Sequence, residues 1–159
     1  MLTPDEIRKI QETVGLDEHK GACCVEALKI VQGQRGWVSD ESLMDIASLL
    51  GMNPSQVDGL ATFYNRIFRK PVGRHVIFLC DNVSCWIMGS DSIRDHLTRK
   101  LGVGFGQTTA DGEFTLLPTA CLGVCDHAPA MMIDDDLHLD LDGEKVDRIL
   151  DQYRRERGK

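Results

Sequence analysis

Apolar residues recur at helical spacing in the N-terminal part of the chain. Residues 3–6 read Thr-Pro-Asp-Glu, which has the form of a capping box with proline at the first helical position and predicts the start of a helix. Three more segments, beginning near Ala22, Ser39 and Asn53, repeat apolar residues at the i, i+3, i+4, i+7 spacing. Four short amphipathic helices with short connections are typical of a small helical bundle.

The fourth of these helices is rich in aromatic residues. Its apolar stripe runs through Val57, Ala61 and Tyr64, which predicts that Tyr64 is buried. Phe63 and Phe68 lie off this stripe. The pattern leaves open whether these two belong to the core or to a surface that contacts another protein.

The pattern changes after Lys70–Gly73, where helical spacing gives way to short apolar runs. Such runs, bounded by glycine and aspartate, are typical of buried strands. The expected strands are 75–79, 114–117, 131–133 and 137–139, and the expected helices are 91–101 and one that begins near Gly143.

This order, β-α-β-β-β-α behind an all-helical segment, predicts an α+β chain. We expect two domains, a helical bundle over residues 1–72 and a mixed domain over residues 73–159. The chain is long enough to bury a sizeable core.

Four of the six cysteines follow the first two expected strands. Cys80 and Cys85 come after the first strand, and Cys121 and Cys125 after the second. Two strands joined through a helix are most simply parallel, so their carboxyl ends meet at one edge of the sheet. We therefore expect the four thiols to gather at the edge where open α/β sheets place ligands.

Composition limits what these thiols can do. The chain is 42% apolar and 27% charged with a net charge of −7, which argues against a nucleic-acid or anionic-membrane partner. No apolar run reaches the roughly 18 residues of a membrane span, and the N-terminal segment resembles no signal or transit peptide. We therefore expect a cytoplasmic protein, in which cysteines serve metal binding or chemistry rather than disulfides.

Spacing narrows the metal chemistry without deciding it. The pairs are C-x4-C and C-x3-C, which supply two half-sites for the two irons of a [2Fe–2S] cluster. Structural zinc remains an alternative, since zinc accepts similar spacings. A thioredoxin-type exchange site requires C-x-x-C, which the chain lacks. A Rieske centre replaces two cysteines with histidines, and it is excluded because no second Cys-His pair accompanies Cys125 and His127. Small residues such as Gly123 would let backbone N–H groups approach the sulfurs.

Three remaining features of the sequence are weaker candidates for a functional role. Cys23 and Cys24 are adjacent on an expected helix, and we interpret them as core residues. Pro129 stands before an expected strand, and either a cis or a trans bond is compatible with the pattern. Residues 134–136 are three aspartates, which lack the spaced ligands of a calcium loop and predict a solvated turn.

The sequence as a whole resembles a known family. Residues 26–38, 59–89 and 106–133, with C-D-N-V-S-C, C-L-G-V-C and the following Ala128-Pro129, are similar to the family of E subunits of bacterial NADH–quinone oxidoreductase, respiratory complex I. Members of this family are thioredoxin-like [2Fe–2S] ferredoxins. The resemblance extends over residues 3–153 and implies a thioredoxin-like fold for residues 73–159.

The resemblance also implies a function. It places one [2Fe–2S] cluster on Cys80, Cys85, Cys121 and Cys125, next to the flavin of a partner subunit that binds FMN and NADH, with further iron–sulfur subunits beyond it. The chain itself has no dinucleotide-binding or P-loop motif. We expect an oxidoreductase subunit without activity alone, peripheral to the inner face of the cell membrane. Similar subunits of NAD-reducing hydrogenases and formate dehydrogenases, a free-standing ferredoxin and a zinc-stabilised interaction module remain alternatives.

Overall fold

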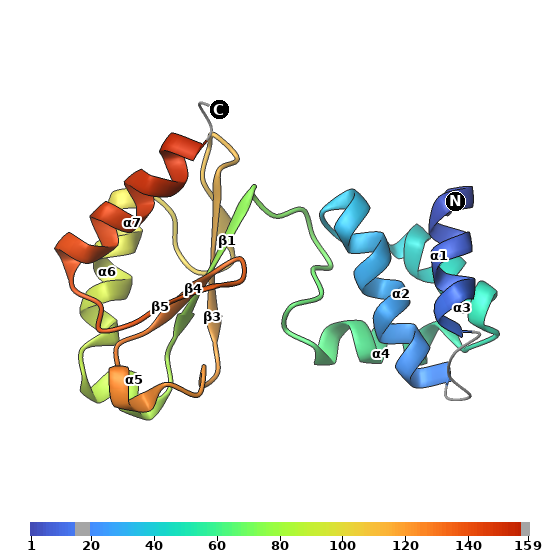
Figure 1. Cartoon of the computed structure of the whole chain (residues 1–159), viewed down its shortest axis with the longest axis horizontal. Helices are drawn as coiled ribbons and strands as arrows, with labels where there is room; N and C mark the ends of the chain where they lie inside the picture. The colour runs from blue at the N-terminus through green and yellow to red at the C-terminus, as the bar shows by residue number, and fades with distance from the viewer. Residues whose placement is uncertain (15–19, 157–159) are drawn as a thin grey trace. The chain divides into compact units, whose positions relative to one another are not determined.

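A computed structural model describes residues 1–14 and 20–156 (Figure 1). The chain divides into two compact units, Met1–Pro71 and Val72–Lys159. Each unit has its own hydrophobic core. The fold is α+β, with a helical first unit and a second unit built on a five-stranded sheet.

In the described residues of the first unit, the chain forms the four helices that the apolar spacing predicts. Their bounds are α1 Pro4–Val14, α2 Lys20–Arg35, α3 Asp40–Leu50 and α4 Pro54–Phe63. Leu28, Ile46 and Val57, from three different helices, are fully buried in the shared core. The core also contains Cys23 and Cys24, as the sequence predicts.

Local side chains determine where these helices begin and end. Ser39 precedes α3, and its hydroxyl accepts a hydrogen bond from the backbone N–H of Ser42. Gly51 ends the helix in the left-handed conformation, which glycine adopts without steric cost. Asn53 and Gln56 then form a reciprocal capping box at the start of α4.

The prediction that Tyr64 is buried is wrong. The helix ends at Phe63, and Tyr64 takes an extended conformation. Its side chain therefore leaves the apolar stripe and is 43% exposed. It packs edge to face on the exposed ring of Phe63, with 5.1 Å between the ring centroids.

The second unit is a mixed sheet with helices. Its strands are β1 His75–Cys80, β2 Gln107–Thr108, β3 Phe114–Thr119, β4 Met131–Ile133 and β5 Asp136–His138. Its α-helices are α5 Val83–Ile87, α6 Ser90–Leu101 and α7 Gly143–Glu156. The strand order is β2-β3-β1-β4-β5.

The two central strands are parallel, as predicted, and the remaining pairs are antiparallel. In the register of β1 and β3, His75 lies opposite Phe114 and Cys80 opposite Thr119. Both strands therefore end at the same edge of the sheet, and the segments that follow them begin side by side.

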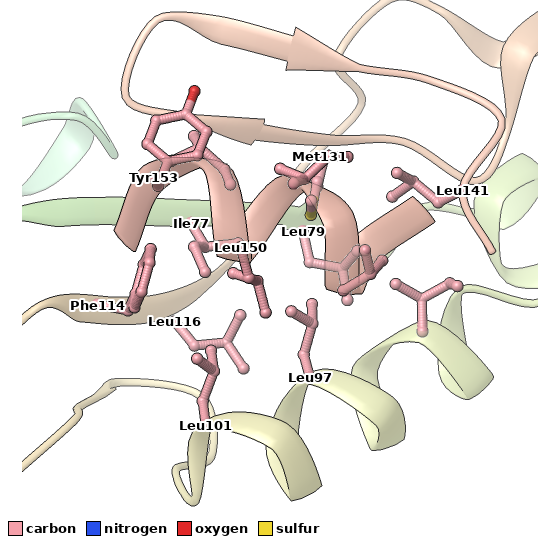
Figure 2. Close-up of a cluster of buried hydrophobic side chains, with 14 of the residues drawn as sticks. Ile77, Leu79, Leu97, Leu101, Phe114, Leu116, Met131, Leu141, Leu150 and Tyr153 are labelled. Carbon is pink, nitrogen blue, oxygen red and sulfur yellow. The ribbon is translucent and has the colours of Figure 1, made fainter. Parts of the chain in front are cut away.

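Helices α6 and α7 lie on the same side of the sheet and cover its core (Figure 1). Figure 2 shows Leu97 and Leu101 of α6 pointing toward Leu116 of β3 and Leu150 of α7. The hydroxyl of Tyr153 points away from this cluster and donates a hydrogen bond to Asp136 Oδ2 at 2.7 Å, which ties α7 to β5.

The aspartate-rich turn does more than the sequence predicts. Asp134 has a positive φ of 54° and lies between β4 and β5. Its carboxylate accepts a hydrogen bond from the backbone N–H of Val76 at 2.9 Å and contacts His75 Nδ1 at 2.7 Å. The turn is therefore anchored to β1. Among the described residues, no helix is both long and apolar enough to span a bilayer.

Candidate metal centre

The first thiol pair lies where β1 gives way to α5. Cys80 is the last residue of β1, and its backbone N–H donates to the carbonyl of Ala130 at 3.1 Å. Asn82 caps α5 through a 2.7 Å hydrogen bond from the backbone N–H of Val83 to its side chain. The short helix turns Cys85 back toward Cys80, and both thiols are buried.

The second thiol pair lies beyond β3. Cys121 follows the last strand residue, Thr119, by two positions, and Cys125 begins the short 3-10 helix η1, Cys125–His127. The two Sγ atoms are 3.4 Å apart. Both thiols are exposed, in contrast to the first pair.

The two pairs meet at one edge of the sheet. Cys80 and Cys85 form a small apolar cluster with Ala128 and Ala130, against which side chains of the second cysteine loop pack. The residues that contribute from that loop are Leu122 and Val124. The hydroxyl of Ser84, next to Cys85, hydrogen-bonds the thiol of Cys125. Within the described ranges, no three Cys, His, Asp or Glu side chains come together as a single metal-binding group, so the thiols approach one another as two pairs.

Backbone N–H groups point at the sulfurs. The N–H of Gly123 donates to Cys121 Sγ at 3.3 Å, and this bond is the largest cause that holds the pKa of the Cys121 thiol below its ordinary value. Gly123 has a φ of +82°, a conformation that side-chain-bearing residues rarely adopt. The N–H of Ala130 similarly donates to the thiol of Cys85.

Burial acts in the opposite direction on Cys85. Removal from water raises the pKa of its thiol to about 11, with a further contribution from its hydrogen bond to Cys80. The pKa of Cys125 is also raised, first by its hydrogen bond to Cys121. Because a metal binds the thiolate, loading these cysteines with iron releases protons and depends on pH.

The sequence also suggested His127, Pro129 and the pair Cys23 and Cys24 as possible site residues. His127 turns to carboxylates, with Nδ1 3.1 Å from Asp140 Oδ2. The Ala128–Pro129 peptide bond is cis. Cys23 and Cys24 belong to the core of the first unit, where burial raises the pKa of Cys24 to about 11.

Sequence reasoning did not predict the hydrogen bonds that Ser84 and Ala130 make to sulfur. Ser84 lies between Cys80 and Cys85 in the sequence, so its position could have indicated a hydroxyl close to the thiols. Ala130 contributes through its backbone, which no residue type reveals.

The donor set suits a [2Fe–2S] cluster. Two thiol pairs, N–H donors aimed at sulfur and a small apolar surround are the features that hold and tune such clusters. The profile of the family described as thioredoxin-like [2Fe-2S] ferredoxin matches residues 7–154. The chain belongs to this family. The cofactor of a thioredoxin-like [2Fe–2S] ferredoxin is one such cluster, in agreement with the sequence prediction.

Individual relatives of this ferredoxin chain are known from bacterial NADH-quinone oxidoreductases. The E subunit of this enzyme from Pseudomonas aeruginosa is 50% identical over 153 residues, covering 96% of this chain and 92% of that protein. The protein of the same name from Escherichia coli K12 matches with the same identity and coverage.

Among solved structures, an NAD+-reducing [NiFe]-hydrogenase in the H2-reduced state contains a similar fold. The TM-score is 0.68 at 26% identity, and the match covers 80% of this chain. It covers only 22% of the hydrogenase chain, so this ferredoxin corresponds to one part of a longer polypeptide.

Proposed function

We propose that the chain is the one-electron carrier subunit of an NADH–quinone oxidoreductase. The observation that carries the proposal is 50% identity to the E subunit of that enzyme over nearly the full length of both chains. The family profile supplies the cofactor class. The position of the thiols at one sheet edge supports the same conclusion.

Cys80, Cys85, Cys121 and Cys125 are the proposed ligands, one pair for each iron. When bound by four thiolates, a [2Fe–2S] cluster takes up and releases one electron at a time. The buried pair at β1 and α5 holds one side of the site away from water. The N–H groups of Gly123 and Ala130 donate to sulfur and so offset part of the negative charge that four thiolates bring.

The proposed electron donor is a partner subunit that binds FMN and NADH. The resemblance on which this rests places the site next to the flavin, and places further iron–sulfur subunits of the same complex beyond it. The assembled complex would lie at the inner face of the cell membrane, with this chain peripheral to it. Residues 73–159 would form the ferredoxin domain and residues 1–72 a separate helical domain.

A second candidate is the corresponding subunit of an NAD-reducing hydrogenase. The structural similarity to such an enzyme favours it. Sequence identity is 26% with the hydrogenase and 50% with the E subunits of NADH–quinone oxidoreductase. The match covers 92% of the E subunit but only 22% of the hydrogenase chain. The respiratory complex is therefore the better-supported parent enzyme.

The proposal predicts a low reduction potential. Four thiolates and two sulfides around two ferric irons carry a charge of about −2, which opposes the addition of an electron. Plant-type all-cysteine centres lie near about −400 mV. A redox titration of the cluster-loaded chain, followed by EPR spectroscopy, should therefore give a midpoint well below 0 mV, and a midpoint well above 0 mV would contradict the assignment.

A further inference from the structure

An exposed apolar surface adjoins the thiols. Val83, Trp86, Ile87 and Met88 are 61%, 60%, 70% and 60% exposed, although they are large and hydrophobic. The first three occupy positions i, i+3 and i+4 of α5, so they share one face of the helix. We call these four residues the α5 surface. Among the described residues, the other large exposed hydrophobic side chains are separate residues such as Met44 and Leu137, apart from the pair Phe63 and Tyr64, whose rings pack on each other.

The α5 surface is held in place rather than loosely attached. Trp86 donates from its indole Nε1 to Asp91 Oδ2 at 3.0 Å, and Asp91 is paired with Arg94 at 2.8 Å. On the other side of α5, Cys85 is packed into the apolar cluster around Ala128 and Ala130. The buried thiol therefore fixes the helix with its apolar face toward solvent. Exposed apolar groups gathered in this way mark interaction sites.

The surface also lies beside the exposed thiols of the second pair. Leu122 and Val124 pack against the apolar side-chain cluster that contains Cys85. In the sequence, these two residues lie between the exposed thiols of the second pair. A partner that covers the α5 surface would thus also cover Cys121 and Cys125. Exclusion of water from such a site is one of the ways in which a protein controls reduction potential.

Charge around the surface indicates the chemistry of the partner. Asp81 precedes α5 and is exposed, Asp91 follows it, and Asp126 next to Cys125 is 79% exposed. The rim of the α5 surface is therefore acidic, although Arg94 offsets the charge of Asp91. A second copy of this chain would bring like charges together, whereas a surface with lysine or arginine around an apolar centre would be complementary.

We propose that the α5 surface is the docking face for the flavin-bearing subunit, which contacts it through apolar side chains ringed by basic residues. This inference rests on the proposed function, because it takes the identity of the partner from there. It adds which residues of this chain form the contact.

The test uses the full-length, cluster-loaded chain and the purified FMN-binding subunit of the same complex. Ile87→Lys and Met88→Lys place a charge in the apolar centre, and each should raise the dissociation constant by about tenfold or more. Met44→Lys is the matched control, since it changes an exposed hydrophobic residue of the first unit and should leave the dissociation constant within about twofold. Binding of the unsubstituted chain should weaken as salt is added, because the acidic rim is then screened.

An unaltered EPR spectrum in the two α5 variants would show that they are folded and loaded, so that weaker binding reports the contact itself. Unchanged affinity in both variants, with a wild-type complex that forms and is reduced by NADH, would overturn the docking face and leave the proposed function intact. Self-association of the chain that Ile87→Lys abolishes would assign the surface to a second copy and overturn the proposal. Absence of a cluster signal and of binding in the wild-type chain would overturn both.

Discussion

At the residue scale, the backbone conformation of Gly123 allows its N–H to donate to a cysteine sulfur. Gly123 lies between the two exposed thiols with φ at +82° and donates its N–H to Cys121 Sγ. Apart from Gly123 itself and its two chain neighbours, no heavy atom lies within 4 Å of the position that a Cβ would take, so the constraint is conformational and not steric crowding. The small residue between the two cysteines indicated a close backbone approach to sulfur, and the hydrogen bond from Gly123 confirms it. The position of Ser84 between two cysteines was a usable signal, but the hydrogen bond of Ala130 to sulfur was beyond prediction, because it is made by the backbone and arises only when two loops meet.

Gly123→Ala should lower the free energy of unfolding by about 1–2 kcal/mol, since an L-residue pays that cost in the left-handed region. Chemical denaturation of the full chain measures it. Gly104→Ala is the control, because Gly104 has no positive φ and a Cβ there would meet only Gln107 Oε1, at 3.7 Å. Equal destabilisation by the two substitutions would contradict the conformational role of Gly123.

At the scale of elements, the long helices and the central strands follow from the apolar pattern. Tyr64 was misplaced because α4 ends one residue earlier than the stripe suggests. The elements α5, β2 and η1 span two to five residues, too few for any periodicity to register. Two of these three, α5 and η1, carry proposed ligands. The least predictable segments are therefore those that shape the site, because their conformation depends on packing between distant parts of the chain.

A buried ion pair joins two helices of the first unit. Glu6 of α1 is 0% exposed, and both of its carboxylate oxygens accept from the guanidinium of Arg35 in α2, at 2.8 and 2.6 Å. The sequence predicts the local half of this arrangement, in which Glu6 also accepts from the N–H of Thr3. It does not predict the contact with Arg35, which lies 29 residues away. Hydrogen bonds from Arg35 are the largest cause that holds the pKa of Glu6 below its ordinary value of 4.5.

Glu6→Gln should lower the free energy of unfolding at neutral pH by roughly 1–3 kcal/mol, because it removes a charged acceptor from a buried hydrogen-bonded pair. A group with a lowered pKa in the folded state stabilises above its unfolded pKa, and that contribution is lost as the pH falls through the folded value. The stability difference between wild type and variant should therefore shrink below pH 4.5. Glu12→Gln, on the same helix but exposed, is the control. A difference that stays constant from about pH 7 to about pH 3 would contradict the assignment.

At the scale of the whole molecule, parallel pairing of β1 and β3 brings together thiols that are far apart in sequence. This convergence could be predicted from strand order alone. The choice of iron over zinc could not, since spacing admits both metals. The parent complex came only from resemblance, because nothing within one chain encodes the identity of its neighbours. The family profile and the relatives then support iron and a respiratory complex.

The most direct test of the central claim measures iron, sulfide and the EPR spectrum of the reduced, full-length chain and its cysteine variants. The wild-type chain should contain two irons and two sulfides. Cys121→Ser and Cys125→Ser should lose the [2Fe–2S] cluster or change its EPR spectrum. Cys24→Ala, in the core of the first unit, should keep the cluster and an unchanged spectrum. A colourless protein with one zinc, or native colour and spectrum in the Cys121 and Cys125 variants, would contradict the account.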